Sequence, residues 1–142
     1  MKKILLITLL LSVGFCQQEW NIEFMKEYGG VTYAPNSKKP YIGKVYSFYD
    51  SGESKEEGKY RNGLKDGKWT QWHSNGQKHK ERTYKNGKKD GLWTEWHSNG
   101  QKRDEGTYKN GKKDGLWTEW HFTGSIYSEK TYRDGELIDE KE

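Results

Sequence analysis

Three histidines recur every 24 residues and raise the question of a shared metal site. His73, His97 and His121 keep this interval, whereas His79 falls outside it. If each repeat is a β-hairpin, equivalent residues lie two strands apart, about 9.6 Å for strands spaced ~4.8 Å. The ligands of one zinc ion must each lie about 2 Å from the metal. The sequence therefore predicts a solvated or packed row of histidines and no metal site.

Tryptophan is the residue type here best suited to binding, and it recurs in two series with the same interval. The six residues are Trp69, Trp93 and Trp117, and Trp72, Trp96 and Trp120. Within a strand, residues three positions apart point to opposite faces, so each series should occupy its own face. Such a row can stabilise a sheet by packing, or it can bind a partner. We expect at least one series to be structural and treat all six as candidate partner-binding residues.

Catalytic motifs are absent from the sequence. There is no glycine-rich phosphate loop, no His-Glu-x-x-His and no Cys-x-x-Cys. Ser74 and Ser98 each follow a histidine, but they are copies of one repeat position. An active site needs unlike groups that converge on one pocket, which a regular repeat does not provide. We expect no enzymatic activity, no catalytic residue and no cofactor.

Lysines gather in one set of predicted turns. They are Lys85, Lys88, Lys89, Lys109, Lys112 and Lys113. One interpretation is a basic rim that binds anionic lipid headgroups or an envelope polysaccharide. Asp66, Asp90 and Asp114 lie in the same turns, however, so a solvated edge is the favoured interpretation.

The repeat itself is the strongest signal in the sequence. Tyr60, Tyr84, Tyr108 and Tyr132 are each 24 residues apart, and residues 91–97 are identical to residues 115–121. The period extends backward in weaker form to Gly43, Val45 and Phe48. We therefore expect four hairpins, which begin near residues 43, 67, 91 and 115 and together span 43–135.

Each repeat carries two turn signals. Asn75-Gly76 and Asn99-Gly100 favour a two-residue hairpin turn in which both residues have positive φ. Asn62-Gly63, Asn86-Gly87 and their equivalents supply turns at the other end. The stretches between them are aromatic and β-branched. The predicted fold is an all-β, single-layer twisted antiparallel meander of tandem 24-residue hairpins, in which each repeat contacts chiefly its neighbours.

The segments outside the repeats have predicted roles of their own. Residues 17–42 are expected to cap the sheet with an irregular hairpin, and a short helix is expected within residues 19–28. Residues 136–142 form a charged C-terminal tail, which suits a sheet edge that resists pairing with another chain.

The N-terminus has the pattern of an export signal. Two lysines precede an apolar run that is about half of the ~20 residues needed to span a membrane, so residues 1–16 predict a signal peptide. Cys16 is either a bystander at the cleavage region or a lipidated residue of a lipoprotein, and simple secretion is favoured. As the only cysteine, it allows no intrachain disulfide.

Composition limits the remaining function classes. The chain has 142 residues, of which 15% are aromatic, including 7 Trp and 10 Tyr, and this argues against disorder. Without Lys2 and Lys3, 23 basic residues face 21 acidic ones, so the net charge falls from +4 to +2. This bias is too weak to predict nucleic-acid binding.

The segment Tyr84–Trp93, repeated as Tyr108–Trp117, resembles the MORN repeat, in the variant form of bacterial proteins labelled YwqK-family toxin–antitoxin antitoxins. The resemblance implies a repeat scaffold that binds partners. Our first hypothesis is an exported, non-enzymatic scaffold that binds a protein through an aromatic sheet face. The alternatives are an antitoxin or immunity-type protein that neutralises a toxin, and a module for envelope glycan or anionic lipid. The oligomeric state stays open.

Overall fold

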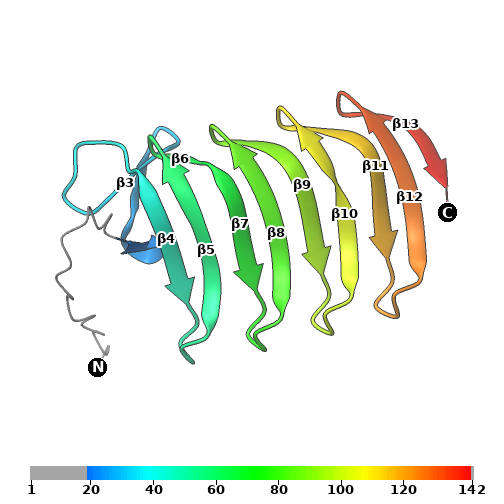
Figure 1. The fold of residues 1–142 in the computed structure, drawn as a ribbon, viewed down its shortest axis with the longest axis horizontal. Helices are drawn as coiled ribbons and strands as arrows, with labels where there is room; N and C mark the ends of the chain where they lie inside the picture. Colours follow the sequence, from blue (N-terminus) through cyan, green and yellow to red (C-terminus); the bar gives the residue numbers. More distant parts are fainter. Residues whose placement is uncertain (1–18, 142) are drawn as a thin grey trace.

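The computed structural model describes residues 19–141, and most of them lie in β-strands (Figure 1). The predicted signal peptide, residues 1–16, lies outside the described residues. The elements are β1 (Trp20–Asn21), the 3-10 turn η1 (Ile22–Phe24), β2 (Lys26–Tyr28), β3 (Val31–Tyr33), β4 (Gly43–Phe48), β5 (Ser54–Arg61), β6 (Leu64–Lys65), β7 (Gly67–Trp72), β8 (Lys78–Lys85), β9 (Lys88–Trp96), β10 (Lys102–Lys109), β11 (Lys112–Trp120), β12 (Ile126–Arg133) and β13 (Glu136–Lys141).

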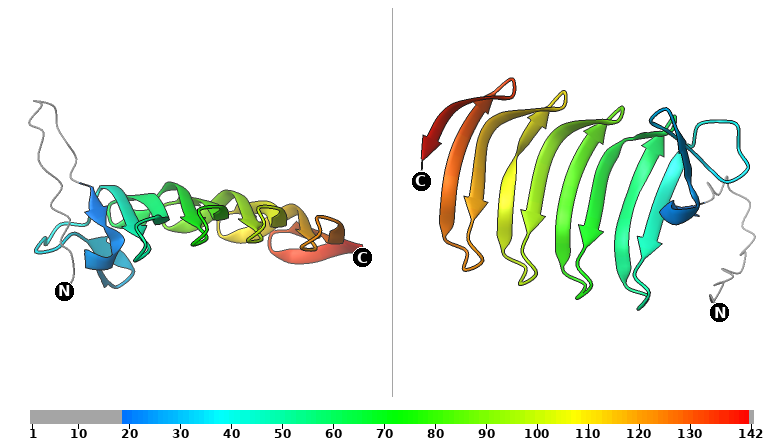
Figure 2. Two further views of the ribbon diagram at one scale, coloured as in Figure 1. Left: turned by 90° about the horizontal axis from the view of Figure 1, so that it is seen from below. Right: turned by 180° about the vertical axis from the view of Figure 1, so that it is seen from behind.

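All of these strands except β2 and β3 form one long sheet that grows hairpin by hairpin. Its order is β1-β4-β5-β7-β8-β9-β10-β11-β12-β13, and β6 pairs with β5 beside this path. All pairings are antiparallel except that of β1 with β4. Seen along the strands, the repeats form a single thin layer with the N-terminal residues gathered at one end (Figure 2). The predicted fold class is thus confirmed.

The upper turns, at the top of Figure 1, are the ones that have the two-residue form, which the sequence predicts for the turns at the other end. In Asn86-Gly87, φ is 48° for the asparagine and 78° for the glycine. Positive φ at both positions suits Asn-Gly, and it gives a turn whose twist matches the flanking strands. Each upper turn also bonds to the hairpin before it, as when Gly87 N–H donates to Lys65 O at 2.8 Å.

The lower turns differ from the prediction. In the Asn75-Gly76 turn only the glycine has positive φ, 81°, and the same holds for Asn99-Gly100. His73 N–H donates to Gln77 O at 2.8 Å, and Gly76 N–H donates to His73 O at 2.9 Å. This is a three-residue loop that ends in a left-handed glycine. The Asn75 side chain favours it, because Oδ1 accepts from Gln77 N at 3.0 Å while Nδ2 donates to Ser98 O at 2.8 Å.

The core is a continuous aromatic row on one face of the sheet, which we call the ladder face. Ring centroids of successive members lie between 5.0 and 6.5 Å apart, mostly edge to face. The members are Tyr60, Trp69, Tyr84, Trp93, Tyr108, Trp117 and Tyr132. Such edge-to-face contacts add about 0.5–1.5 kcal/mol per pair beyond area burial. A one-layer sheet therefore obtains its core from ring contacts that alternate within and between hairpins.

Glycines opposite two of the indoles let them lie flat on the sheet. Gly58 pairs with Val45 on one side and sits beneath Trp69, and Gly106 pairs with Trp93 and sits beneath Trp117. A Cβ at either glycine would overlap the indole ring. With the ring flat, Trp117 Nε1 donates to Thr107 O at 3.2 Å, so its polar atom is satisfied although the side chain is buried.

The N-terminal residues cover the first part of the ladder face. Tyr41, Val45, Tyr60 and Trp69 form a buried cluster against which Trp20, Ile22, Met25 and Ala34 pack. Tyr41 occupies the position that Lys65 has in the next repeat. Gly63 N–H donates to Tyr41 O at 2.7 Å, just as Gly87 N–H donates to Lys65 O. This segment includes the small β2–β3 sheet and a bridge between Tyr33 and Pro40.

Two expectations for the chain ends are revised. The short helix within residues 19–28 is wrong except for η1, because Trp20 and Asn21 pair with β4. The charged segment from Glu136 to Lys141 is ordered as β13, an exposed strand at the end of the sheet, rather than a tail.

We predict that Gly106→Ala destabilises the protein by about 1–3 kcal/mol, because the new methyl group must displace Trp117 from a packed position. Gly106 has no positive φ, so the substitution adds bulk without backbone strain. Urea unfolding followed by tryptophan fluorescence measures the effect. Thr107→Val, on the other face of the same strand, is the control and should stay within about 0.5 kcal/mol of the parent. Equal stability of the two variants would contradict this account of the ladder.

Candidate functional site

The strand register confirms that the two tryptophan series occupy opposite faces. Trp93 pairs with Gly106 on the ladder face, and Trp96 pairs with Lys102 on the other, which we call the open face. Trp69, Trp93 and Trp117 are 2%, 7% and 5% exposed, so the fold leaves little of them to contact a partner. Trp72, Trp96 and Trp120 are half-buried and remain within reach of a ligand.

Large apolar side chains stand on the upper part of the open face. Leu92 and Leu116 are 51% and 54% exposed, although the equivalent residues of the earlier repeats are Lys44 and Lys68. The core of the sheet does not require these leucines, because the first two repeats have lysine at the same position. The sequence analysis did not identify them as binding candidates. The change from lysine in the first two repeats to leucine in the last two could have indicated them.

Below the leucines, threonines and glutamates alternate across the open face. Thr70, Thr94 and Thr118 are buried, and Thr94 Oγ1 donates to Glu105 Oε2 at 3.1 Å. Lys102 Nζ lies 2.7 Å from Glu105, and the equivalent Lys78–Glu81 pair is at 2.8 Å. The hydrogen bond from Lys78 lowers the pKa of Glu81. Charges on this part of the open face are therefore locally paired.

The lower margin of the open face carries two equivalent hollows. We call the first the Trp96 hollow, which is lined by Gln77, Lys78, Trp96, Asn99, Gly100 and Gln101. The second, the Trp120 hollow, is lined by Gln101, Lys102, Trp120, Thr123 and Gly124. Each combines an indole, a lysine and a glutamine amide. Because Gln101 lines both, the two hollows are neighbours along the sheet.

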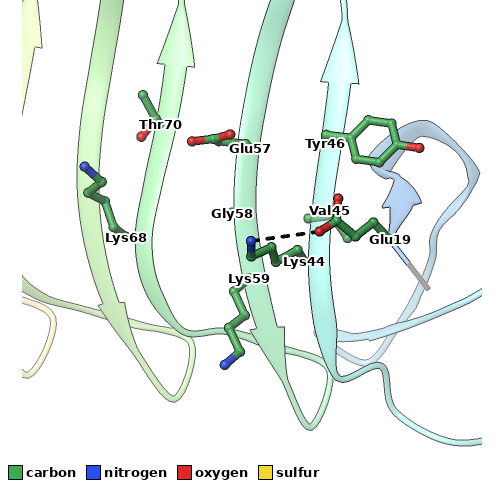
Figure 3. A pocket seen from close by; sticks show the side chains of 9 residues that line it. All are labelled: Glu19, Lys44, Val45, Tyr46, Glu57, Gly58, Lys59, Lys68 and Thr70. Atoms are coloured by element: carbon green, nitrogen blue, oxygen red, sulfur yellow. Dashed lines mark ion pairs between the residues drawn. The ribbon is translucent and has the colours of Figure 1, made fainter. Parts of the chain in front are cut away.

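A further hollow lies at the N-terminal end of the open face (Figure 3). Its lining residues are Glu19, Lys44, Val45, Tyr46, Glu57, Gly58, Lys59, Lys68 and Thr70. Lys44 Nζ lies 3.9 Å from Glu19 Oε1, and both side chains are largely exposed. The hollow contains no hydroxyl–imidazole pair that could act as a nucleophile and base, and its charges are of both signs.

The histidines form a row that joins neighbouring lower turns. Nε2 of His73 lies 3.1 Å from Trp96 O, and Nε2 of His97 lies 3.1 Å from Trp120 O. Because a carbonyl only accepts, Nε2 carries the proton in this geometry. Tyr49 does the same one repeat earlier, as its hydroxyl donates to Trp72 O at 2.6 Å. Among residues 19–141, no three metal-ligating side chains cluster together.

An ionic cluster breaks the repeat in the middle of the ladder face. Glu95 is 6% exposed and pairs with Arg82 at 2.8 Å and with Arg103. Burial opposes its ionisation, but the hydrogen bond from Arg82 and the charges of Arg103 and Lys80 outweigh burial and lower the pKa of Glu95. Arg82 stands where Gly58 and Gly106 stand in neighbouring repeats, so Trp93 Nε1 bonds to Glu95 instead of to the backbone.

The lysines of the upper turns form the solvated edge favoured by the sequence only in part. Lys89 Nζ lies 4.3 Å from the Trp93 ring centroid, and Lys113 Nζ lies 4.1 Å from that of Trp117. Burial lowers the pKa of Lys89. These two lysines cover the ladder through cation–π contacts and so serve the fold, whereas Lys85, Lys88, Lys109 and Lys112 are exposed.

Comparison with known proteins agrees with this architecture. The family model described as MORN repeat variant matches residues 65–86, 89–110 and 113–134. The chain matches no curated protein. Within residues 19–141 there is no helix of sufficient length and apolarity to cross a membrane. The three matched segments coincide with successive hairpins of this sheet, in agreement with its repeat architecture.

Proposed function

We propose that the protein is an exported, non-enzymatic scaffold that binds a partner protein with its open face. The observation that carries the proposal is that the two faces of the sheet differ in the exposure of their large apolar side chains. The indoles of the ladder face are buried by the fold, whereas Leu92 and Leu116 are about half exposed on the open face without a structural need.

The composition of the open face supports a protein partner. The two leucines lie above the half-buried Trp96 and Trp120, and paired charges such as Lys102–Glu105 surround them. Aromatic and apolar anchors within a polar surround are typical of protein interfaces, where a few residues supply most of the binding energy. Regular hairpins also form a rigid platform, which lowers the entropic cost of binding.

Leu92→Glu with Leu116→Glu should abolish partner binding without loss of fold. Both side chains are exposed, and the equivalent positions of the earlier repeats already carry a charged residue, lysine, so the melting temperature should stay close to that of the parent. A photocrosslinking amino acid at residue 92 or 116 should give a discrete adduct with one protein in cells, and the same label at Lys109 should not. The double variant should weaken binding of that purified protein more than tenfold, equivalent to ~1.4 kcal/mol. Adducts that are identical from all three positions would contradict the proposal.

Export is the second part of the proposed function and is tested separately. The support is the short apolar run of residues 4–13 after Lys2 and Lys3. In a bacterial host we expect the shortened chain in the soluble extracytoplasmic fraction, and Cys16→Ser should behave identically. A palmitate analogue that labels the parent but not Cys16→Ser would show lipidation in place of simple secretion. Retention of the uncleaved chain in the cytoplasm would contradict export.

A further inference from the structure

We propose that the Trp96 and Trp120 hollows together bind an extended, neutral β-1,4-linked sugar chain, with one disaccharide unit per repeat. The inference concerns the lower margin of the open face. It is independent of the protein contact at Leu92 and Leu116, which lie near the upper turns.

Each hollow has an exposed glutamine amide that lies against the glycine of the next lower turn. Gln77 packs against Gly100, where a Cβ would lie 2.6 Å from Gln77 Oε1, and Gln101 packs against Gly124 in the same way. Within the described residues, neither amide group bonds to another protein group, so its donors and acceptor are available to a ligand. An amide offers both, which matches neighbouring sugar hydroxyls.

The turns that carry these amides are themselves fixed to one another. Asn75 Nδ2 donates to Ser98 O, and Asn99 Nδ2 donates to Phe122 O, both at 2.8 Å. His73 and His97 add a contact to the end of the next hairpin. The turns next to the two glutamines are therefore fixed before a ligand arrives, which reduces the ordering cost of binding.

The indoles supply the apolar part of the site. Trp96 and Trp120 each line one hollow, and Lys78 and Lys102 each place Nζ over the ring, 5.6 Å from its centroid. The C–H groups on the face of a pyranose ring carry partial positive charge and pack on the negative face of an aromatic ring. An indole beside amide groups is thus a combination that recognises a sugar ring.

Spacing and charge define which sugar polymer fits. Equivalent points of adjacent hairpins are two strands apart, about 9.6 Å. The disaccharide repeat of an extended β-1,4-linked chain has nearly this length, so alternate rings would meet equivalent indoles. The lysines of both hollows are already paired with Glu81 and Glu105, so the site offers no unpaired cation to an anionic polymer.

The test is titration of the purified protein with chito-oligosaccharides and cello-oligosaccharides, followed by tryptophan fluorescence and calorimetry. The two series share the linkage and differ in the acetamido group, so they distinguish the source of the sugar. With either series, we expect a tetrasaccharide to bind at least tenfold more tightly than a disaccharide because it reaches both hollows. Gln101→Leu, which alters both hollows, should reduce tetrasaccharide affinity at least tenfold.

Gln77→Leu alters one hollow and should bring the tetrasaccharide to the affinity of the disaccharide. Lys109→Ala, in an upper turn, is the control and should bind like the parent. The inference is overturned if neither series binds at millimolar concentration, if affinity does not rise with chain length, or if Gln101→Leu binds normally while its melting temperature is unchanged. Binding of a protein at Leu92 and Leu116 without any oligosaccharide binding would overturn this inference and leave the proposed function intact.

Discussion

The aromatic row that runs from Tyr60 to Tyr132 is the interaction on which the rest of the structure depends. A single-layer sheet has no second layer to pack against, so each buried indole packs between a tyrosine of its own hairpin and a tyrosine of the hairpin before it. Gly58 and Gly106 permit this packing because they have no side chain, so the indoles of Trp69 and Trp117 can lie flat against the backbone there. Because every second contact of the row joins one hairpin to the next, stability accumulates along the sheet as a sum of neighbour terms.

Because the aromatic row occupies one face of the sheet, only the other face is left exposed. The ladder face is closed by its own tryptophans, by Lys89 and Lys113 above them, and by the residues around Tyr41 at the N-terminal end. The open face needs only small, paired polar residues such as Thr94 and Glu105 to continue the sheet. The position of Leu92 and Leu116 carries lysine in the earlier repeats, so it varies without loss of the fold, which is the property expected of a recognition surface.

The sequence was sufficient for the architecture but not for all of its details. The 24-residue period and the Asn-Gly turns predicted the hairpins, and strand alternation placed the two tryptophan series on opposite faces. The lower turns differed because Asn-Gly serves in both two-residue and three-residue loops, and here the bonds of Asn75 to its neighbours decide between them. The environment of Glu95 could not be predicted, since Arg82 and Arg103 reach it from two different strands. Departures from the repeat could have indicated both features: Leu92 stands where Lys68 stands one repeat earlier, and Arg82 stands where Gly58 does.

The central claim is that one tryptophan series builds the fold while the other is left for binding, and the free energy of unfolding of two matched variants tests it most directly. Trp117→Leu should lose about 3 kcal/mol or more, because it removes a buried ring from the row between Tyr108 and Tyr132. Trp120→Leu, three residues away on the open face, should lose only about 1 kcal/mol. Equal losses, or a larger loss for Trp120→Leu, would contradict the division of the sheet into a structural face and a binding face.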